Sequence, residues 1–134
     1  MSNLILISHG RFAEELLKSV EMIVGPQENI HTVCLLPQEG ESEFRLKLDT
    51  ILNELEGDIT IFADLFGGTP CNIASKKILA GEKFDLYAGM NMPMVISYVN
   101  ESLTGVKAEF VSDGQNNVVY VNEKILSVLE DDED

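Results

Sequence analysis

Two residues whose chemistry could act together each follow a short apolar run of the kind that forms a buried strand. His9 closely follows the run Leu4–Ile7, and Asp64 directly follows residues 59–63. In open α/β sheets, reactive groups gather at the carboxyl ends of the strands, where the strand order reverses. A carboxylate on one imidazole N–H fixes the tautomer and stabilises the cation that forms when the other nitrogen attacks. The pair therefore predicts an activated histidine nucleophile.

Groups that could hold an oxyanion surround this predicted pair. Backbone N–H groups lie at Gly10, where the first helix begins, and in the turn formed by Gly67 and Gly68. Thr69 adds a hydroxyl at the start of the third helix. Helix N-termini favour phosphate because their first N–H groups lack partners within the helix. The combination predicts a histidine that receives a phosphoryl group and passes it on.

Each of these residues also has an ordinary structural interpretation. Asp64 could only cap the turn before the third helix, and the two glycines that follow could only form a tight turn. His31 has no such setting and is expected at the surface or at a strand edge. Neither of the common phosphate-loop patterns, GxxxxGK[ST] and GxGxxG, occurs in the chain.

Alternating strand and helix patterns are expected to position these residues. Strands are predicted at 3–8, 31–36, 59–63 and 84–88. Helical spacing of apolar residues predicts a helix after each strand. The predicted helices run from Phe12 to Val24, along the stripe Phe44, Leu48, Ile51, Leu52 and Leu55, from a cap at Thr69 to Gly81, and from about Met94 to Val99.

This alternation predicts an α/β fold, namely a three-layer α/β/α sandwich with a mainly parallel, doubly wound sheet. A strand order of 2-1-3-4 makes the first and third strands neighbours, so that His9 and Asp64 meet at the switch point. After residue 103 the pattern weakens. Residues 118–121 could form a last strand, either antiparallel or exchanged with another chain, and a short helix carrying Ile125, Leu126 and Leu129 could follow.

The bulk composition limits the classes of protein to which this chain can belong. Its 134 residues suit one domain, expected over 1–129 with an acidic tail over 130–134. The net charge is −14, and −9 remains without that tail. A nucleic-acid binder is excluded because it needs a basic patch, whereas a basic protein partner is attractive.

The setting of the protein is expected to be the reducing cytoplasm. Cys34 and Cys71 lie far apart and form no CxxC pair. We find no signal-peptide pattern at the N-terminus and no apolar segment long enough to span a bilayer. We expect no metal and no cofactor.

Three segments at strand ends carry a family resemblance. They are Ile7 to Gly10 with Phe12-Ala13, Asp64 to Pro70 with Asn72 and Ala74-Ser75, and Ala88 to Met94. With this spacing, over roughly residues 3–100, the chain resembles the IIA component of the mannose family (mannose/fructose/sorbose type) of the bacterial phosphoenolpyruvate-dependent sugar phosphotransferase system.

The resemblance implies a homodimeric cytoplasmic phosphotransferase. Its histidine takes phosphate from phospho-HPr and passes it to a IIB component, which phosphorylates a sugar during import through the membrane subunits IIC and IID. His9 matches the phosphorylated histidine of the family, and Asp64 matches the aspartate that orients it. The residues that fall in loops lining the family's site are Phe66, Thr69, Asn91 and Met92.

Two features depart from the family pattern. Residues 101–134 do not obviously match the longer C-terminal helix and exchanged strand of the family, which bears on the dimer contact. The chain also lacks the Ala/Pro-rich linker and the IIB domain to which some relatives are fused, so its IIB partner is expected to be a separate polypeptide.

Four alternatives remain open at this point. A receiver domain would need an acidic pair after the first strand, where this chain has Ser8-His9. A flavin-binding module would need a Ser/Thr-rich phosphate loop there. A thiol enzyme could use Cys71 near a helix N-terminus, although this side chain is expected to pack inward. The phosphotransfer subunit of the dihydroxyacetone kinase system has a related domain but differs in the loop over residues 66–70.

Overall fold

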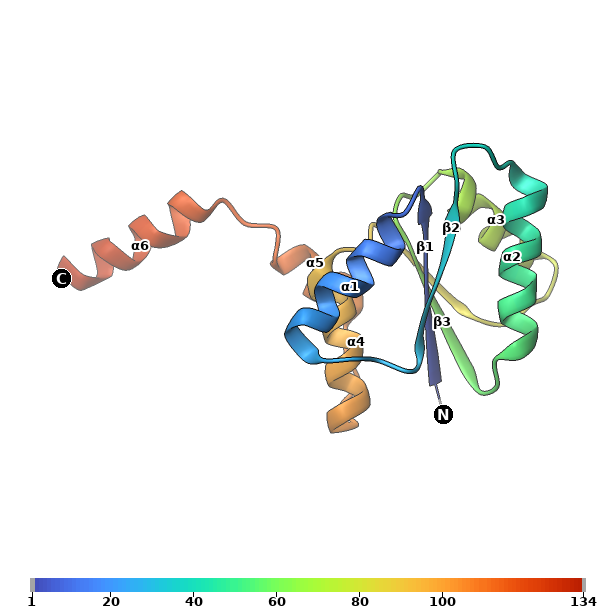
Figure 1. Cartoon of the computed structure of the whole chain (residues 1–134). Helices are drawn as coiled ribbons and strands as arrows, with labels where there is room; N and C mark the ends of the chain where they lie inside the picture. The colour runs from blue at the N-terminus through green and yellow to red at the C-terminus, as the bar shows by residue number, and fades with distance from the viewer. Residues whose placement is uncertain (1, 134) are drawn as a thin grey trace.

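A single parallel sheet forms the centre of the protein, as the computed structural model shows for residues 2–133 (Figure 1). Within these residues it has four strands in the order β2-β1-β3-β4. The predicted parallel sheet and its order 2-1-3-4 are confirmed. The strands are β1 (Ser2–His9), β2 (Ile30–Leu35), β3 (Asp58–Ala63) and β4 (Asp85–Ala88).

Helices cover both faces of this sheet, so the predicted three-layer sandwich is confirmed (Figure 1). One core cluster joins β1 to α1 and α4, and the other joins β1 to α2 and α3. No helix within residues 2–133 is long and apolar enough to cross a membrane. The helices are α1 (Phe12–Val24), α2 (Glu41–Glu54), α3 (Thr69–Leu79), α4 (Met92–Thr104), α5 (Phe110–Asn116) and α6 (Val121–Glu133).

The central strand β1 explains why the two predicted site residues meet. Residues 4–7 are fully buried, as expected for a parallel strand covered on both faces. Ile7 pairs with Ala63 of β3, and the Asp64 backbone N–H donates to the Ile7 carbonyl at 3.1 Å. His9 and Asp64 therefore leave neighbouring strands at the same edge of the sheet.

The helix starts differ in detail from those predicted. Gly68, in extended backbone, is the N-cap of α3, and Thr69 is its first helical residue, so the predicted Thr69 cap is wrong by one position. The reason is local: the Gly68 carbonyl already accepts the first helical bond, from the Asn72 N–H at 2.9 Å. Helix α4 begins earlier than predicted because Asn91 caps it, its side chain accepting from the Met94 N–H, and it continues to Thr104, where Gly105 in the left-handed conformation ends it.

The predicted last strand at 118–121 is wrong for this structure. Residues 118–120 connect α5 to α6, and α6 begins at Val121 and extends away from the sheet (Figure 1). A strand needs a neighbouring edge for its N–H and C=O groups. Helix α5 packs against α4 and leads the chain away from the free edge of β4, so no such neighbour is reached.

The helix predicted near the C-terminus is confirmed as part of α6. The domain limits predicted from the sequence, 1–129 with a tail at 130–134, stay a prediction, with Met1 and Asp134 outside the described residues.

Candidate active site

The structure brings His9 and Asp64 together at the carboxyl end of the sheet. The Asp64 Oδ2 atom accepts a hydrogen bond from the His9 backbone N–H at 2.9 Å and lies 2.8 Å from the His9 Nδ1 atom. Asp64 is largely enclosed, with 12% of its side chain exposed, whereas the His9 side chain is 48% exposed. One carboxylate oxygen thus fixes both the backbone and the ring of the histidine.

This contact determines which ring nitrogen is available for chemistry. A carboxylate oxygen can only accept, so Nδ1 carries the proton in the neutral ring and Nε2 keeps its lone pair. The other oxygen of Asp64, Oδ1, is buried and has no hydrogen-bond partner among the described residues. A poorly solvated anion interacts strongly with a cation formed on the adjacent ring. The pair therefore suits nucleophilic attack by Nε2.

Gly68 lies directly against the imidazole ring. A Cβ atom at this position would lie 2.7 Å from His9 Cε1 and 3.4 Å from His9 Nε2, so only glycine leaves room for the ring. Gly67, with φ of +86°, makes the turn that presents Gly68 to His9. Nε2 therefore lies next to the N-terminus of α3, where the N–H groups of Thr69 and Cys71 have no partner within the helix.

Gly10 makes the turn into α1 on the other side of His9. Its φ is +55°, a left-handed value that favours glycine. Its backbone N–H donates to the Leu35 carbonyl of β2 at 2.7 Å, so this predicted donor is engaged within the chain. Gly10 thus shapes the turn that follows the histidine.

Exposed apolar side chains lie in the same loops as His9 and Asp64. Phe66 is 83% exposed, and Leu65 beside it and Phe12 at the start of α1 are about half exposed. Large apolar side chains left in solvent near reactive groups are typical of protein-binding surfaces. The sequence pointed to Phe66 alone, because Phe12 has the spacing of an inward-facing helix residue.

The other two predicted site residues belong to the end of β4. Asn91 uses its side-chain oxygen to cap α4 and its side-chain N–H₂ to donate to the Gly114 carbonyl at 3.1 Å. Met92 is the first residue of α4 and is half-buried. Since β3 lies between β4 and β1, this loop is a strand further from His9 than the Gly67-Gly68 turn is.

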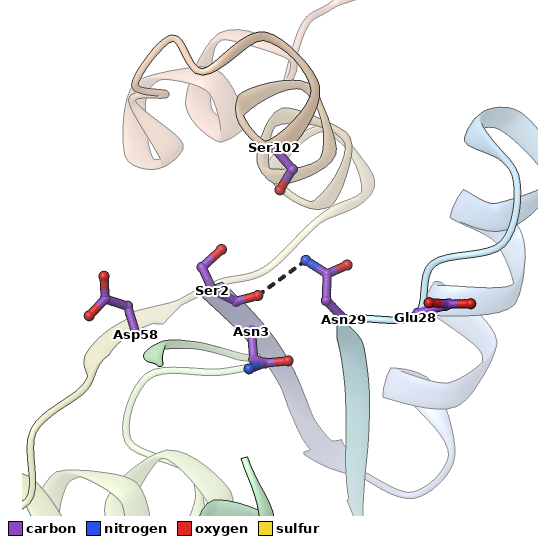
Figure 2. A pocket seen from close by; sticks show the side chains of 6 residues that line it. All are labelled: Ser2, Asn3, Glu28, Asn29, Asp58 and Ser102. Atoms are coloured by element: carbon purple, nitrogen blue, oxygen red, sulfur yellow. Dashed lines mark hydrogen bonds between the residues drawn. The ribbon is translucent and has the colours of Figure 1, made fainter. Parts of the chain in front are cut away.

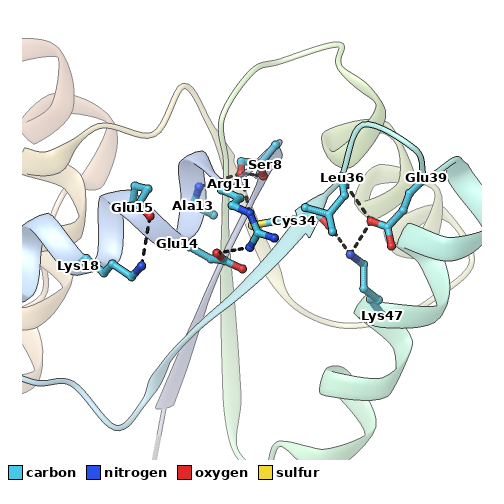
Figure 3. Close-up of polar contacts among 11 residues, drawn as sticks. Ser8, Arg11, Ala13, Glu14, Glu15, Lys18, Cys34, Leu36, Glu39 and Lys47 are labelled. Atoms are coloured by element: carbon cyan, nitrogen blue, oxygen red, sulfur yellow. Dashed lines mark hydrogen bonds and ion pairs between the residues drawn. The ribbon is translucent and has the colours of Figure 1, made fainter.

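Several basic side chains near the carboxyl end of the sheet form ion pairs with carboxylates (Figure 3). Arg11 binds Glu14 at 3.0 Å, and Lys47 binds Glu39 at 2.6 Å. The hydrogen bond from Lys47 lowers the pKa of Glu39 and keeps it ionised. Arg11 and Lys47 are thereby matched by nearby carboxylates.

The remaining histidine and the two cysteines are partly or fully buried. His31 contacts Asn3 through Nε2 at 3.2 Å, and burial lowers its pKa. Cys71 packs inward as predicted, with 2% of its surface exposed, which removes the basis for a thiol enzyme. Burial also raises the pKa of Cys34, so this thiol is protonated at neutral pH.

A polar hollow lies at the opposite end of the strands from His9 (Figure 2). It collects acidic, amide and hydroxyl side chains and no nucleophilic base, and the Asn29 side chain donates to the Ser2 carbonyl at 3.3 Å. Its lining residues are Ser2, Asn3, Glu28, Asn29, Asp58 and Ser102. His9 instead has a half-exposed side chain, which suits a protein partner better than a small enclosed substrate.

Comparisons with known proteins agree with this geometry. The family model EIIA-man, described as the PTS system fructose IIA component, matches residues 3–113. The PTS system mannose-specific EIIAB component of Escherichia coli is 33% identical over 95 residues, which are 69% of this chain and 29% of that protein. The chain thus spans less than a third of that relative.

Two further similarities cover nearly the whole chain. The PTS system sorbose-specific EIIA component of Lacticaseibacillus casei is 28% identical, over 97% of this chain and 98% of that protein. The solved mannose/sorbose-specific IIA subunit of Enterococcus faecalis has a TM-score of 0.78 and 34% identity, covering 89% of this chain and 93% of that one.

Proposed function

Because this chain belongs to the family of PTS fructose IIA components, we propose that it carries phosphoryl groups in a sugar phosphotransferase system, with His9 as the carrier. It accepts phosphate from phospho-HPr and passes it to a IIB component. The assignment of the site rests on one observation: His9 Nδ1 contacts the Asp64 carboxylate while Nε2 lies beside the start of α3. The family match favours this role over the dihydroxyacetone kinase system.

In the proposed reaction the Nε2 lone pair attacks the phosphorus atom of the phosphohistidine on the donor. The P–N bond of the donor breaks as the new P–Nε2 bond forms, and the donor imidazole leaves with its electron pair. The proton stays on Nδ1, where Asp64 balances the positive charge of the ring. The N–H groups of Thr69 and Cys71, in the first turn of α3, are donors that could hold the phosphoryl oxygens. Transfer to IIB repeats these steps with His9 as the donor.

The partners in this proposal are proteins of the cytoplasm. HPr and a IIB component dock in turn on the exposed surface around His9, and IIB then phosphorylates the sugar during its import through the membrane subunits IIC and IID. The net charge of −14 favours partners with a basic docking face. No metal or cofactor enters the reaction.

The experiment that tests this proposal is reconstitution of the phosphoryl relay. The chain, incubated with phosphoenolpyruvate, enzyme I and HPr, should gain one phosphoryl group that is labile in acid and stable in base, as a phosphohistidine is. Mass spectrometry of the intact chain counts the groups. Absence of labelling in the complete mixture would contradict the proposal.

Phe66 is expected to contribute to docking of phospho-HPr. Phe66→Ala should raise KM for phospho-HPr by about tenfold, or about 1.4 kcal/mol of binding free energy, since aromatic residues are enriched among the few interface residues that dominate binding. The transfer rate at saturation should change little. Steady-state kinetics measures both values. Leu79→Ala is the matched control, because Leu79 is also exposed but lies at the far end of α3. An unchanged KM for Phe66→Ala would place the docking surface elsewhere.

Gly68 is expected to be indispensable for the position of the ring. In Gly68→Ala the new methyl group overlaps Cε1 of His9, and a displacement of about 1 Å costs on the order of 100-fold in rate. Rapid-quench measurement of transfer from phospho-HPr gives the effect. Gly40→Ala is the matched control, since Gly40 is also an extended N-cap glycine but its added Cβ would meet only the Glu43 side chain at 3.4 Å. Equal rates for the two variants would contradict this role.

We further propose that the protein is a homodimer held by its C-terminal arm, defined as residues 118–130. The outer edge of β4 pairs with no strand in the part of the chain that the structure describes. The arm carries a dense set of exposed apolar side chains. They are Val118, Val119, Tyr120, Val121, Ile125, Leu126, Val128 and Leu129. An open edge and an unpacked apolar segment both favour pairing with a second copy.

Truncation tests this assembly. The full chain should be a dimer in light scattering, and a chain ending at Asn117 should be a monomer, because it loses every apolar residue of the arm while keeping α5 on α4. A chain ending at Leu129 should remain a dimer, since only the acidic residues 130–134 are removed. A full-length monomer at tens of micromolar would contradict the proposal.

A further inference from the structure

We propose that Ser8 is a positioning residue for His9, acting through the turn between β1 and α1; this inference rests on the proposed role of His9. Ser8 is fully buried, an unusual place for a hydroxyl unless its hydrogen bonds are satisfied within the protein. Along β1, successive side chains point to opposite faces of the sheet. Ser8 therefore faces the layer of α1, and His9 faces the layer of α3.

The Ser8 hydroxyl bonds to two backbone groups in the turn and helix start that follow His9. It accepts a hydrogen bond from the Ala13 backbone N–H at 2.8 Å (Figure 3). It also donates to the Gly10 carbonyl at 3.2 Å. Cys34 Sγ, at 4.0 Å, is its only other polar neighbour among the hydrogen bonds of the described residues. One hydroxyl thus closes the turn that begins immediately after the reactive histidine.

No other side chain in the turn can replace this connection. Arg11 occupies the N-cap position of α1 but makes no capping bond with its side chain, which instead pairs with Glu14. The first turn of α1 therefore depends on Ser8 to bond the buried N–H of Ala13. Without the hydroxyl, neither this N–H nor the Gly10 carbonyl is hydrogen-bonded to Ser8 at the end of β1.

The consequence for His9 follows from how its backbone and ring are held. Its backbone N–H is held by Asp64, the next residue is held by Leu35, and the ring lies against Gly68. A turn released from α1 lets the backbone at Gly10 rotate, and the ring then leaves the geometry in which Nδ1 meets Asp64. Ser8 thus acts on the reaction only through His9.

Two variants test this inference. Ser8→Ala removes the hydroxyl, and Ser8→Cys, under reducing conditions, keeps nearly the same volume with a much weaker hydrogen-bonding group. Ser75→Ala is the matched control, because the Ser75 hydroxyl also bonds to a backbone carbonyl, that of Cys71, but within α3. For each variant we would measure kcat and KM with phospho-HPr, thermal stability, and the tautomer of His9 by ¹⁵N NMR.

Both Ser8 variants should lower kcat by about 10- to 100-fold while KM for phospho-HPr stays within twofold of the parent. The parent should show the Nδ1–H tautomer of His9, and the variants should show a mixture of both tautomers. A variant with the parental kcat and tautomer would overturn the inference even if its thermal stability fell, because Ser8 would then be only a helix cap.

The NMR measurement separates this inference from the proposed function. It uses the unphosphorylated chain, so it reports the effect of Ser8 on His9 whether or not phospho-HPr is the donor. A parent that takes no phosphate on His9 would defeat the proposed function, whereas an unmoved tautomer in both Ser8 variants would defeat the role of Ser8.

Discussion

Replacement of His9 by alanine should abolish phosphorylation of the chain by phosphoenolpyruvate, enzyme I and HPr. The expected loss is complete because His9 is the one residue in the described structure that combines a free ring nitrogen, a carboxylate on the other nitrogen and a helix N-terminus beside it. Incorporation of phosphate into the intact chain, measured by mass spectrometry, checks the result. Circular dichroism should be unchanged, since His9 is half exposed and lies outside the core clusters.

His31→Ala is the matched control and should label like the parent. His31 is the second residue of the edge strand β2, away from the carboxyl end where His9 lies, bonds to Asn3, and has its pKa lowered by burial. Labelling that persists in His9→Ala, or that disappears only in His31→Ala, would move the phosphorylation site away from the end of β1.

The sequence was sufficient to predict the arrangement of the sheet and the meeting of His9 with Asp64. Parallel strands buried on both faces appear as continuous apolar runs, and β1 and β3 are runs of this kind. The strand order then follows from a small set of allowed α/β topologies. Once the order is known, the carboxyl ends of β1 and β3 must lie side by side, whatever the details of packing.

The sequence did not predict features that depend on which strand or hydrogen-bond partner a given group meets in the folded protein. Val118 to Val121 has the composition of a strand, but composition does not supply the edge that a strand needs. Residues 118–120 instead lie in the connection between α5 and α6, and Val121 begins α6. Gly10 and Asn91 were predicted to face the phosphate or a partner, yet the N–H of the first and the side chain of the second bond within the chain.

Close packing explains what was missed around the ring. The contact between Gly68 and His9 Cε1 depends on the path of the turn after β3, which no spacing rule encodes. The role of Ser8 had a signal that could have found it: a polar residue directly follows an apolar run and is placed to cap the helix that starts four residues later. Buried polar residues next to reactive ones are therefore candidates for positioning residues, because their hydrogen bonds fix the backbone.

Asp64→Asn should slow phosphoryl transfer in both directions, to His9 and from it, by about 10²- to 10⁴-fold. The asparagine keeps the shape of the side chain and an oxygen that can accept from the His9 N–H, so the fold should survive. It removes the negative charge that balances the ring once Nε2 is phosphorylated. Rapid-quench rates with phospho-HPr in the forward direction, and with HPr and the phosphorylated chain in reverse, measure the effect.

Asp58→Asn provides the matched control for this prediction, because Asp58 is the first residue of the same strand, is exposed, and lies at the opposite end of β3. It should transfer phosphate at the parental rate. Comparison of the two variants separates the effect of the charge beside Nδ1 from the effect of removing any one carboxylate from a chain of net charge −14. Rates for Asp64→Asn within twofold of the parent would show that Asp64 only shapes the turn after β3. The ring of His9 would then act with its position set by Gly68 and the turn into α1.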